Sequence, residues 1–502
     1  MDQRTELWIK GALCVLAAAA VLWRERRSQR LAERRAGQLL GALAIAAVAA
    51  YYNFGLFHGS GYVHYWEQFH YFLGSKYFPE LGYDGLYVAS LAAQAEALPE
   101  YPVQAAVRDL RTNQVVPTFV VTQQKADVHR RFSAARWSAF VADNRHFLEA
   151  NDPDYIRQIR TDHGYNPSPT WTFVARLFDR ALPASRTTLT LLGLLDPLLL
   201  LTAFVVLFRT YGARVGCVAL VVFGLGYPWR YYWIGGAFLR QDWLAACVIA
   251  ICLLKRERYA VAGCLFAYAA MVRIFPVLFL FGPALLAVRA AIRRERLGWA
   301  LRLAGGFVLG VAACVAAGAL TGRGAAAWPE FVHNLEKHEG TWLTNNVGLE
   351  NVVLYGPGTM TRRLVNWSLP DPFAMWHAHM DRLRGERRPM VWGAAAVLLA
   401  FVGTAAWRSR RDEAAVLGPA AVFAVLLLTC YYWAMLLVLP LRRGPWTAAG
   451  VLAMSAGMYA LDLSNTTFEM LYGLMSWALL ILFLAWCWPD ALAAIRRRAS
   501  PG

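Results

Sequence analysis

Side chains that can move a proton are concentrated in residues 64–87, HYWEQFHYFLGSKYFPELGYDGLY, in a chain whose other long stretches are mostly apolar. If the start of this stretch is helical, Glu67, His70 and Tyr71 lie three and four positions apart and share one face. General acid–base catalysis uses a carboxylate beside an imidazole in this way. The stretch is therefore a candidate site at the membrane surface.

A simpler interpretation of the same residues is an interfacial helix. Tyr65, Trp66 and Tyr71 have the amphipathic rings that gather at the headgroup level of a bilayer. For these aromatic side chains we favour the simpler interpretation, which leaves the acid and the imidazole as the chemical candidates.

Three charged residues lie at the ends of apolar runs between residues 229 and 276, namely Arg240, Asp242 and Arg273. A charge at the edge of a membrane span is costly and by default marks a functional site. Arg240 and Asp242 are equally well explained as a pair with each other. Arg273 has no partner nearby in the sequence and precedes Ile-Phe-Pro, which favours an anionic ligand at the outer leaflet.

Further polar residues suit contact with a sugar or a lipid headgroup. One group begins DHGYNPSPTW, residues 162–171, a turn run marked by proline and glycine. In a second group, His338 lies at the end of a helix predicted at about residues 328–338, and Asn345 and Asn346 lie in the turn that follows. An ordinary solvated helix explains this second group equally well. The substrate-pocket candidates are Asp162, His163, Asp242, His338, Asn345 and Asn346.

The composition is that of a polytopic membrane protein, with 58% hydrophobic residues, 17% charged residues and a mean hydropathy of +0.36. The net charge of +17 does not indicate a nucleic-acid partner, because the basic residues cluster in short loops between apolar runs, as cytoplasmic loops do. These clusters are Arg24–Arg35, Lys255–Arg258, Arg289–Arg296, Arg408–Arg411, Arg442–Arg443 and Arg496–Arg498.

The apolar runs and basic loops predict an all-α protein of about 13 transmembrane helices, with the N-terminus external and the C-terminus cytoplasmic. Five parts follow: two helices with a basic loop (1–57), a large, partly helical external loop between helices 2 and 3 (58–185), a central bundle (186–320), a second external loop (321–389) and C-terminal helices (390–502). All ten histidines fall in the two external loops. Chemistry is therefore expected on the outer face, although polar loops are where histidine collects in any case.

Local patterns predict some secondary structure in these loops. Residues 99–114 and 126–148 have helical spacing with apolar stripes. Near the C-terminus, the chain has to turn around Tyr431 and Tyr432 and re-enter as a short helix if Arg442 is to be cytoplasmic.

Several classes of chemistry have no sequence support. The eight cysteines lie within or at the ends of apolar runs, with no CxxC and no Cys/His cluster, so neither a disulfide framework nor a zinc site is indicated. Walker A, GxSxG and HExxH motifs do not occur. We expect no cofactor; a divalent metal is possible but nothing in the sequence supports one.

Two blocks of residues resemble the GT-C superfamily of integral-membrane glycosyltransferases, especially the bacterial family 87 proteins that resemble polyprenyl-phosphate-mannose-dependent mannosyltransferases. The first block is an acidic residue soon after a membrane helix, followed by Tyr, Gly and a Tyr-Pro-like run: Glu67, Tyr71, Gly74, Tyr77 and Pro79. The second is Gln241-Asp242, KRER, AVAGCLFAYAAM, Arg273 and Pro276. Together the blocks cover residues 58–289.

The resemblance implies an enzyme that transfers a sugar from a polyprenyl-phosphate carrier to an acceptor on the external face of a bacterial plasma membrane. Glu67, oriented by His70, would be the catalytic base, with Asp84 as the second choice. Arg273, together with Arg240 or Lys76, would hold the donor phosphate. The family usually has Asp and Lys where this chain has Glu67 and Arg273. The implied partners are membrane lipids and the lipid-linked donor; the sugar and the acceptor are not specified.

Two other classes remain open. A transporter or flippase for a lipid-linked sugar would use Arg240, Asp242 and Arg273 to line a path, but a path needs polar residues in the cytoplasmic half of its helices as well. Residues 244–254 and 260–271 are nearly all apolar, which favours the transferase. A non-catalytic assembly or receptor protein would have the same fold with no need for Glu67.

Overall fold

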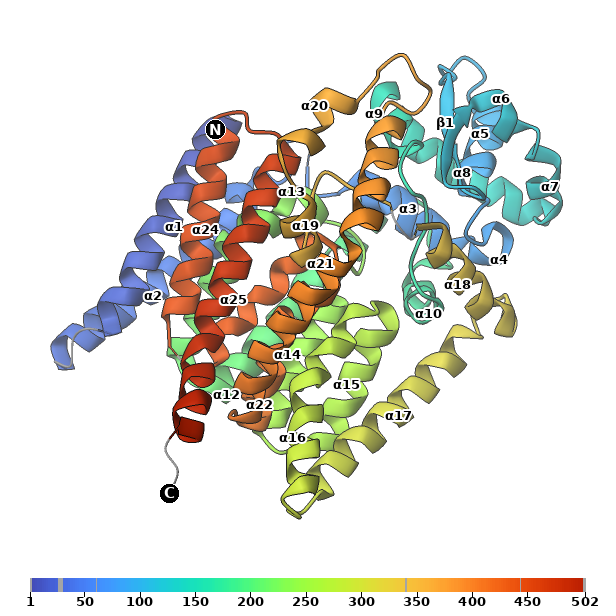
Figure 1. The fold of residues 1–502 in the computed structure, drawn as a ribbon. Helices are drawn as coiled ribbons and strands as arrows, with labels where there is room; N and C mark the ends of the chain where they lie inside the picture. Colours follow the sequence, from blue (N-terminus) through green and yellow to red (C-terminus); the bar gives the residue numbers. More distant parts are fainter. Residues whose placement is uncertain (1, 26–29, 60, 339–340, 443, 500–502) are drawn as a thin grey trace.

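The computed structural model describes residues 2–25, 30–59, 61–338, 341–442 and 444–499 (Figure 1). The protein is 75% helical, and strands among the described residues form only two short antiparallel pairs, so the predicted all-α class is confirmed. Part of the basic loop Arg24–Arg35 and all of Arg443 lie outside the described residues.

Six described helical stretches are long and apolar enough to cross a membrane, and three shorter apolar helices accompany them. This supports a multi-pass membrane protein, but it does not confirm about 13 spans. The six stretches are Gln3–Trp23, Arg186–Leu225, Phe275–Ile292, Gly298–Gly318, Ala374–Trp407 and Phe468–Arg496, and the shorter ones are Arg35–Tyr51, Tyr259–Val272 and Cys430–Leu441.

The helical bundle pairs elements that are distant in the sequence. Helix α1 packs against α24, α2 against α12, and α15 against α17. Gly263 and Gly306 bring α15 and α17 together backbone to backbone, because a Cβ at either position would meet a main-chain oxygen of the other helix. The bundle elements are α1 (Gln3–Glu25), α2 (Arg30–Tyr51), α11 (Arg186–Gly193), α12 (Leu195–Leu225), α14 (Asp242–Lys255), α15 (Tyr259–Val272), α16 (Phe281–Ile292), α17 (Gly298–Gly318), α21 (Ala374–Trp407), α22 (Arg411–Val416), α23 (Gly418–Val425), α24 (Trp446–Leu463) and α25 (Phe468–Ala499).

Helix α12 contains a reversal of the chain. Gly212 has φ 83° and ψ 167°, which is not helical, and the Phe208 ring lies 2.7 Å from the position of a Cβ on Gly216. Residues eight positions apart in one straight helix would be about 12 Å apart along the axis. The chain therefore folds back at Gly212, as expected from the two apolar runs predicted on either side of it.

A polar head formed by residues 58–185 sits at one end of the bundle, drawn from blue to cyan in Figure 1. The helices predicted within residues 126–148 are present. The prediction of a helix for residues 99–114 is wrong, because this segment contributes to a β-hairpin. Its turn places Asn113 at φ 58°, and the β-branched Val107, Val115 and Val116 favour strands. The head contains α3 (Tyr65–Lys76), α4 (Phe78–Leu81), α5 (Leu86–Ala97), β1 (Ala106–Asp109), β2 (Gln114–Pro117), α6 (Thr118–Thr122), α7 (Lys125–Arg130), α8 (Ala134–Glu149), α9 (Pro153–Ile159) and α10 (Pro169–Asp179).

The second polar segment, residues 321–389, is not separate from the membrane helix that follows, because α21 runs through Pro389 without a break. Its β3 (Asn346–Val347) pairs with β4 (Leu428–Thr429). Tyr431 and Tyr432, where a turn was predicted, lie in the first turn of a 3-10 helix, η6 (Cys430–Leu441), which follows directly on β4 and is mostly buried. The remaining α-helices are α13 (Tyr231–Ile234), α18 (Ala327–His338), α19 (Leu349–Leu354) and α20 (Thr361–Leu364). Short 3-10 helices are η1 (Asn53–Gly55), η2 (Tyr227–Trp229), η3 (Phe275–Leu280), η4 (Gly324–Ala326) and η5 (Pro357–Thr359).

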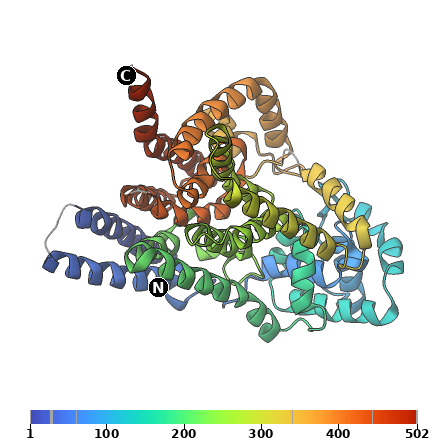
Figure 2. The same ribbon diagram turned by 90° about the horizontal axis from the view of Figure 1, so that it is seen from below.

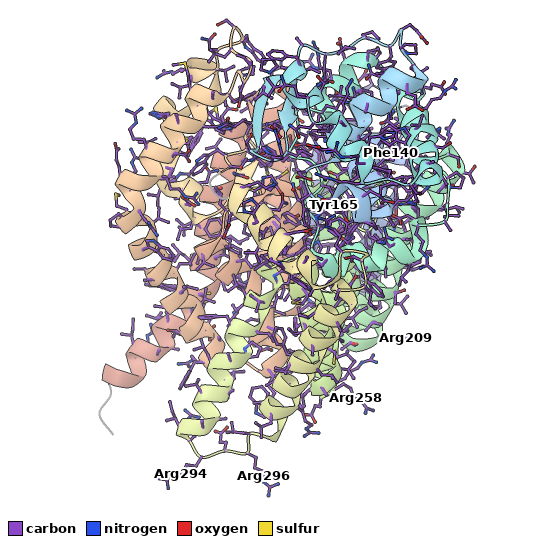
Figure 3. The ribbon with its side chains drawn as sticks, turned by 90° about the vertical axis from the view of Figure 1, so that its right-hand side faces the viewer. Phe140, Tyr165, Arg209, Arg258, Arg294 and Arg296 are labelled. Carbon is purple, nitrogen blue, oxygen red and sulfur yellow. The ribbon has the colours of Figure 1, made fainter. Side chains whose placement is uncertain are left out.

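Basic turns gather at the end of the bundle away from the head. Figure 3 shows Arg209, Arg258, Arg294 and Arg296 at that end, far from Phe140 in the head. Helix α1 begins at the head end and α25 finishes at the opposite end (Figure 1). Seen from below, α1 and α2 lie at the edge opposite the head (Figure 2). Which end faces the cytoplasm stays a prediction from the basic turns.

Candidate functional site

Helix α3 lies where the head meets the bundle. Its N-cap residue His64 accepts a hydrogen bond from the backbone N–H of Glu67 through Nδ1 at 3.3 Å. Gln68 is buried, and its Nε2 donates to the Leu189 carbonyl of α11 at 3.0 Å. Gly74 is the contact point for the Tyr165 ring, which would clash with a Cβ there. These contacts fix which face of α3 is turned towards the bundle.

Glu67 and Tyr71, one turn apart on that face, both contact Arg240. The Glu67 Oε2 atom lies 2.9 Å from Arg240 Nε, with 14% and 3% of the two side chains exposed. Arg240 also donates through Nη1 to the Tyr71 hydroxyl, and its guanidinium lies 4.4 Å from the centre of the Tyr71 ring. The predicted shared face of α3 is therefore an arginine-binding face.

The loop before α14 holds Arg240 in place. Asp196 of α12 accepts the backbone N–H of Arg240 at 2.8 Å and that of Gln241 at 3.0 Å, one with each carboxylate oxygen. The centre of the Tyr431 ring lies 5.3 Å from the Arg240 guanidinium. Residues from three distant parts of the chain therefore hold this arginine.

Arg273 follows the last residue of α15, at the same end of the α14–α15 hairpin as Arg240. Its Nη1 donates to the carbonyl of Val272 at 2.9 Å. Its Nε and Nη2 atoms are buried and have no hydrogen-bond partner among the described residues. Arg273 interacts electrostatically with Tyr432, Tyr71, Arg240 and Asp242. Arg273 is half-buried as a residue, and two of its guanidinium nitrogens are buried donors that are not used.

Asp242 does not pair with Arg240, so the simple ion pair that the sequence left open is not what forms. Its Oδ2 accepts from the Tyr268 hydroxyl at 2.8 Å and its Oδ1 from the backbone N–H of Trp243 at 2.8 Å. The acidic partner of Arg240 is instead Glu67 of the head.

The environment of Glu67 suits a proton acceptor. Burial raises the pKa of Glu67 above its ordinary value, and the positive charge of Arg240 acts in the opposite direction. A carboxylate whose pKa moves towards neutrality is a stronger base once its counter-ion is drawn away.

His70 does not orient Glu67 through a hydrogen bond. Its Nε2 lies 2.8 Å from the hydroxyl of Tyr87, which in turn donates to the carbonyl of Ile159. Burial lowers the pKa of His70. The side chain that contacts Glu67 among the described residues is Arg240, whereas His70 contacts Tyr87.

Two other predicted site residues have partners elsewhere. Lys76 is buried, and its Nζ lies 2.6 Å from Asp143 Oδ2 and 2.6 Å from the Leu182 carbonyl, so its ammonium is not free for a phosphate. Asp84 forms a half-exposed ion pair with Arg131 at 3.3 Å, which leaves its carboxylate open to solvent.

Asp162, His163 and His338 form a second polar cluster between the head and α18. Asp162 Oδ2 accepts from Trp66 Nε1 at 2.7 Å. The His163 and His338 rings are 5.7 Å apart. His338 Nε2 lies 2.7 Å from Asn166 Oδ1, and its buried Nδ1 has no partner among the described residues. Burial is the main cause that lowers the pKa of His163 to about 3 and that of His338 to about 4.

Asn345 and Asn346 lie closer to the first cluster than the sequence suggested. Asn346 pairs with Thr429 in the short β3–β4 ladder, and the Asn345 carbonyl accepts the backbone N–H of Cys430 at 2.9 Å. They therefore position the chain just before Tyr431.

The aromatic residues around the two arginines were not predicted from the sequence. Tyr432, Trp243 and Phe275 pack with ring centres 4.8–6.0 Å apart, next to Tyr431. The adjacent pair Tyr431-Tyr432 was visible as a turn, but its partners across the fold were not. Asp196 was also missed, because it sits inside an apolar run with no pattern around it.

No group of three or more His, Cys, Asp and Glu side chains that could hold a metal ion occurs in the part of the chain that the structure describes. No protein-family model matches the chain, and neither a curated protein nor a solved structure shows a significant match to it.

Proposed function

We propose that the protein is a membrane glycosyltransferase that takes a sugar from a polyprenyl-phosphate donor on the outer face of a bacterial plasma membrane, with Glu67, Arg240 and Arg273 as its active site. The observation that carries the proposal is the pair of buried Arg273 nitrogens, Nε and Nη2, that have no partner among the described residues, at the same end of the α14–α15 hairpin as the Glu67–Arg240 pair.

The two arginines fit the phosphate of the donor. A guanidinium presents N–H groups in a fork that matches phosphate oxygens, and charge-assisted hydrogen bonds of this kind are the strong ones. Arg273 Nε and Nη2 gain partners when a phosphate binds, which removes the penalty of burying them unpaired. Arg240, drawn towards the same anion, releases part of its hold on Glu67.

The transfer then needs few further groups. The hydroxyl oxygen of the acceptor attacks the anomeric carbon, its proton passes to the Glu67 carboxylate, and the bond from that carbon to the phosphate oxygen breaks. The electron pair of that bond leaves on the lipid phosphate, whose charge Arg273 and Arg240 stabilise.

The surroundings fit a lipid-borne sugar. The cluster lies where the apolar hairpin α14–α15 meets the polar head, so the polyprenyl tail can stay in the bilayer while the sugar faces the head. The rings of Tyr431, Tyr432 and Trp243 beside the arginines provide flat apolar surfaces for a sugar or for the first isoprene units.

A transporter or flippase is the alternative from another class. It would need a polar route through the bundle, whereas Leu244–Leu254 on α14 and Ala260–Met271 on α15 are nearly all apolar. No observation favours it over the transferase.

Detergent-purified protein incubated with polyprenyl-phosphate sugars and membrane lipid extract tests the proposal. The expected result is sugar transfer with release of free polyprenyl phosphate. Movement of intact donor across reconstituted vesicles without its consumption would identify a transporter. Failure to bind any polyprenyl phosphate would exclude both functions.

A further inference from the structure

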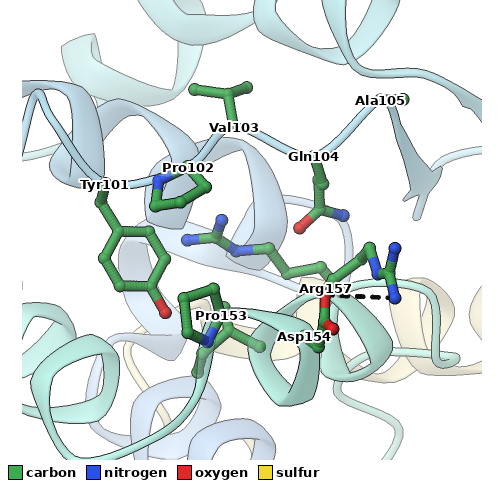
Figure 4. Close-up of a pocket in the computed structure, with 10 residues that line it drawn as sticks. Tyr101, Pro102, Val103, Gln104, Ala105, Pro153, Asp154 and Arg157 are labelled. Atoms are coloured by element: carbon green, nitrogen blue, oxygen red, sulfur yellow. Dashed lines mark ion pairs between the residues drawn. The ribbon is translucent and has the colours of Figure 1, made fainter.

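A small pocket in the polar head, away from α14 and α15, is lined by the segment Tyr101–Ala105 and by α9. Its volume is about 220 Å³. Figure 4 shows Tyr101 and Pro102 facing Pro153 across it, with Gln104 and Arg157 towards the other end. Pockets for drug-sized ligands span about 300–1,000 Å³, so this one suits a single sugar ring or a similarly small molecule.

The floor of the pocket carries a buried cation with no acidic partner. Arg160 lines the pocket and is 1% exposed. It forms no ion pair among the described residues and donates only to neutral groups, at 2.6 Å to Gln94 Oε1 and 2.8 Å to Ser90 Oγ. Its Nε is buried without a partner. Burial lowers the pKa of Arg160 to about 10, so the side chain stays charged at neutral pH.

A second unused donor lies beside it. The hydroxyl of Tyr101 is buried and has no hydrogen-bond partner among the described residues, and it interacts electrostatically with Arg160. Gln94 of α5 ties the two together, because it accepts from Arg160 and donates to the Tyr101 carbonyl at 3.1 Å. Burying a charge and a hydroxyl unpaired costs free energy that an anion in the pocket would recover.

The rim adds a further cation. Arg157 forms only a loose ion pair with Asp154, at 3.2 Å and with 55% and 73% of the side chains exposed, and such pairs contribute little. Arg157 can therefore turn towards a ligand, while Asp154 and Gln104 offer hydrogen bonds to hydroxyl groups.

We propose that this pocket binds a small organic carboxylate the size of one sugar ring, with the carboxylate held by Arg160 and Tyr101 and closed over by Arg157. A free acid and an acidic sugar residue of a longer glycan share this chemistry. The site is separate from the proposed transfer site, because Glu67, Arg240 and Arg273 are not among the residues that line the pocket.

The test is a titration of the full-length protein in detergent, without any sugar donor, so that its result does not depend on the transfer reaction. Glucuronate is the probe, glucose is its neutral counterpart, and inorganic phosphate is the competing anion. We expect saturable binding of glucuronate, at least tenfold weaker binding of glucose and no stronger binding of phosphate. If a uronate-containing oligosaccharide binds more tightly than glucuronate, the natural ligand is an acidic sugar within a glycan. If the two bind equally, the natural ligand is a free acid.

Tyr101→Phe is the decisive variant, because it removes an unpartnered hydroxyl and should leave the thermal midpoint unchanged or raised while weakening glucuronate binding at least fivefold. Arg157→Gln should weaken binding to a similar degree. Arg145→Gln on α8, which breaks an exposed pair with Glu149, is the matched control and should bind as the unaltered protein does. No saturable glucuronate binding, equal binding of glucose, or unchanged binding in both Tyr101→Phe and Arg157→Gln would overturn the proposal.

Discussion

The carboxylate of Glu67 and the guanidinium of Arg240 lie 2.9 Å apart and join the first helix of the polar head to the start of α14. The pair is largely shielded from water, so each charge depends on the other. Removing one partner of a buried pair is costly because the remaining charge is left uncompensated. An anion that binds next to Arg240 can therefore change the state of Glu67.

Arg273→Gln should separate binding from stability. Because Nε and Nη2 of Arg273 have no partner, the substitution should leave the thermal midpoint unchanged or raise it. The affinity for polyprenyl phosphate should fall at least tenfold, since charge-assisted hydrogen bonds contribute about 1.5–3 kcal/mol each. A lipid-binding titration and a thermal melt measure the two effects.

The matched control is Arg442→Gln. Arg442 is fully buried and paired with Asp490, so its loss should destabilise the protein by about 3–5 kcal/mol. If Arg273→Gln instead destabilises the protein as strongly and binds the lipid normally, Arg273 is a structural arginine.

Lys76→Met should show the opposite behaviour to Arg273→Gln. Lys76 is paired with buried Asp143, so the substitution should destabilise the protein by about 3–5 kcal/mol without weakening lipid binding in the folded fraction. The double variant Lys76→Met with Asp143→Leu should recover part of the lost stability. A tenfold loss of lipid affinity at unchanged stability would restore Lys76 as a phosphate ligand.

The His163–His338 cluster should make stability depend on pH. Both pKa values lie below the ordinary 6.5, at about 3 and about 4, mainly because of burial. Between those values and about pH 6.5 the unfolded chain binds protons that the folded chain does not, so stability falls as pH decreases through this window. Nearby Arg108 and Lys337 lower the pKa of His338 further.

His338→Gln keeps a donor for Asn166 and removes the titration, so its thermal midpoint should fall less than that of the unaltered protein between about pH 7 and about pH 5. His333→Gln, at an exposed position on the same helix, is the control and should follow the unaltered protein. Parallel curves for His338→Gln and the unaltered protein would show that the cluster is not the source of the dependence.

Features with a local signal were predictable from the sequence. Helix α3 and the shared face of Glu67 and Tyr71 follow from spacing, and so does the α14–α15 hairpin, whose basic turn KRER places Arg240 and Arg273 at the same end. The β-hairpin was missed because short strands with mixed polar residues share their apolar spacing with helices. The composition indicated a membrane protein, but six long apolar helices do not confirm the number of spans.

Partners that come from distant segments were not predictable. Nothing near Arg240 in the sequence indicates that Glu67 would replace Asp242 as its partner, or that Asp196 would bind its backbone. His70 is one turn from Glu67, but tertiary contacts turn it towards Tyr87. Side-chain identity marked the candidates, whereas only packing across the fold decided which of them meet.

The role of Glu67 as the catalytic base is tested by comparing Glu67→Gln with Asp84→Asn in the transfer assay. Both changes remove a carboxylate that the sequence predicts as a candidate base. Asp84 forms a half-exposed ion pair, so Asp84→Asn should change the transfer rate less than twofold. For Glu67→Gln we expect the transfer rate to fall about 10²–10⁴-fold with polyprenyl phosphate still bound. Transfer at the unaltered rate by Glu67→Gln would contradict this role.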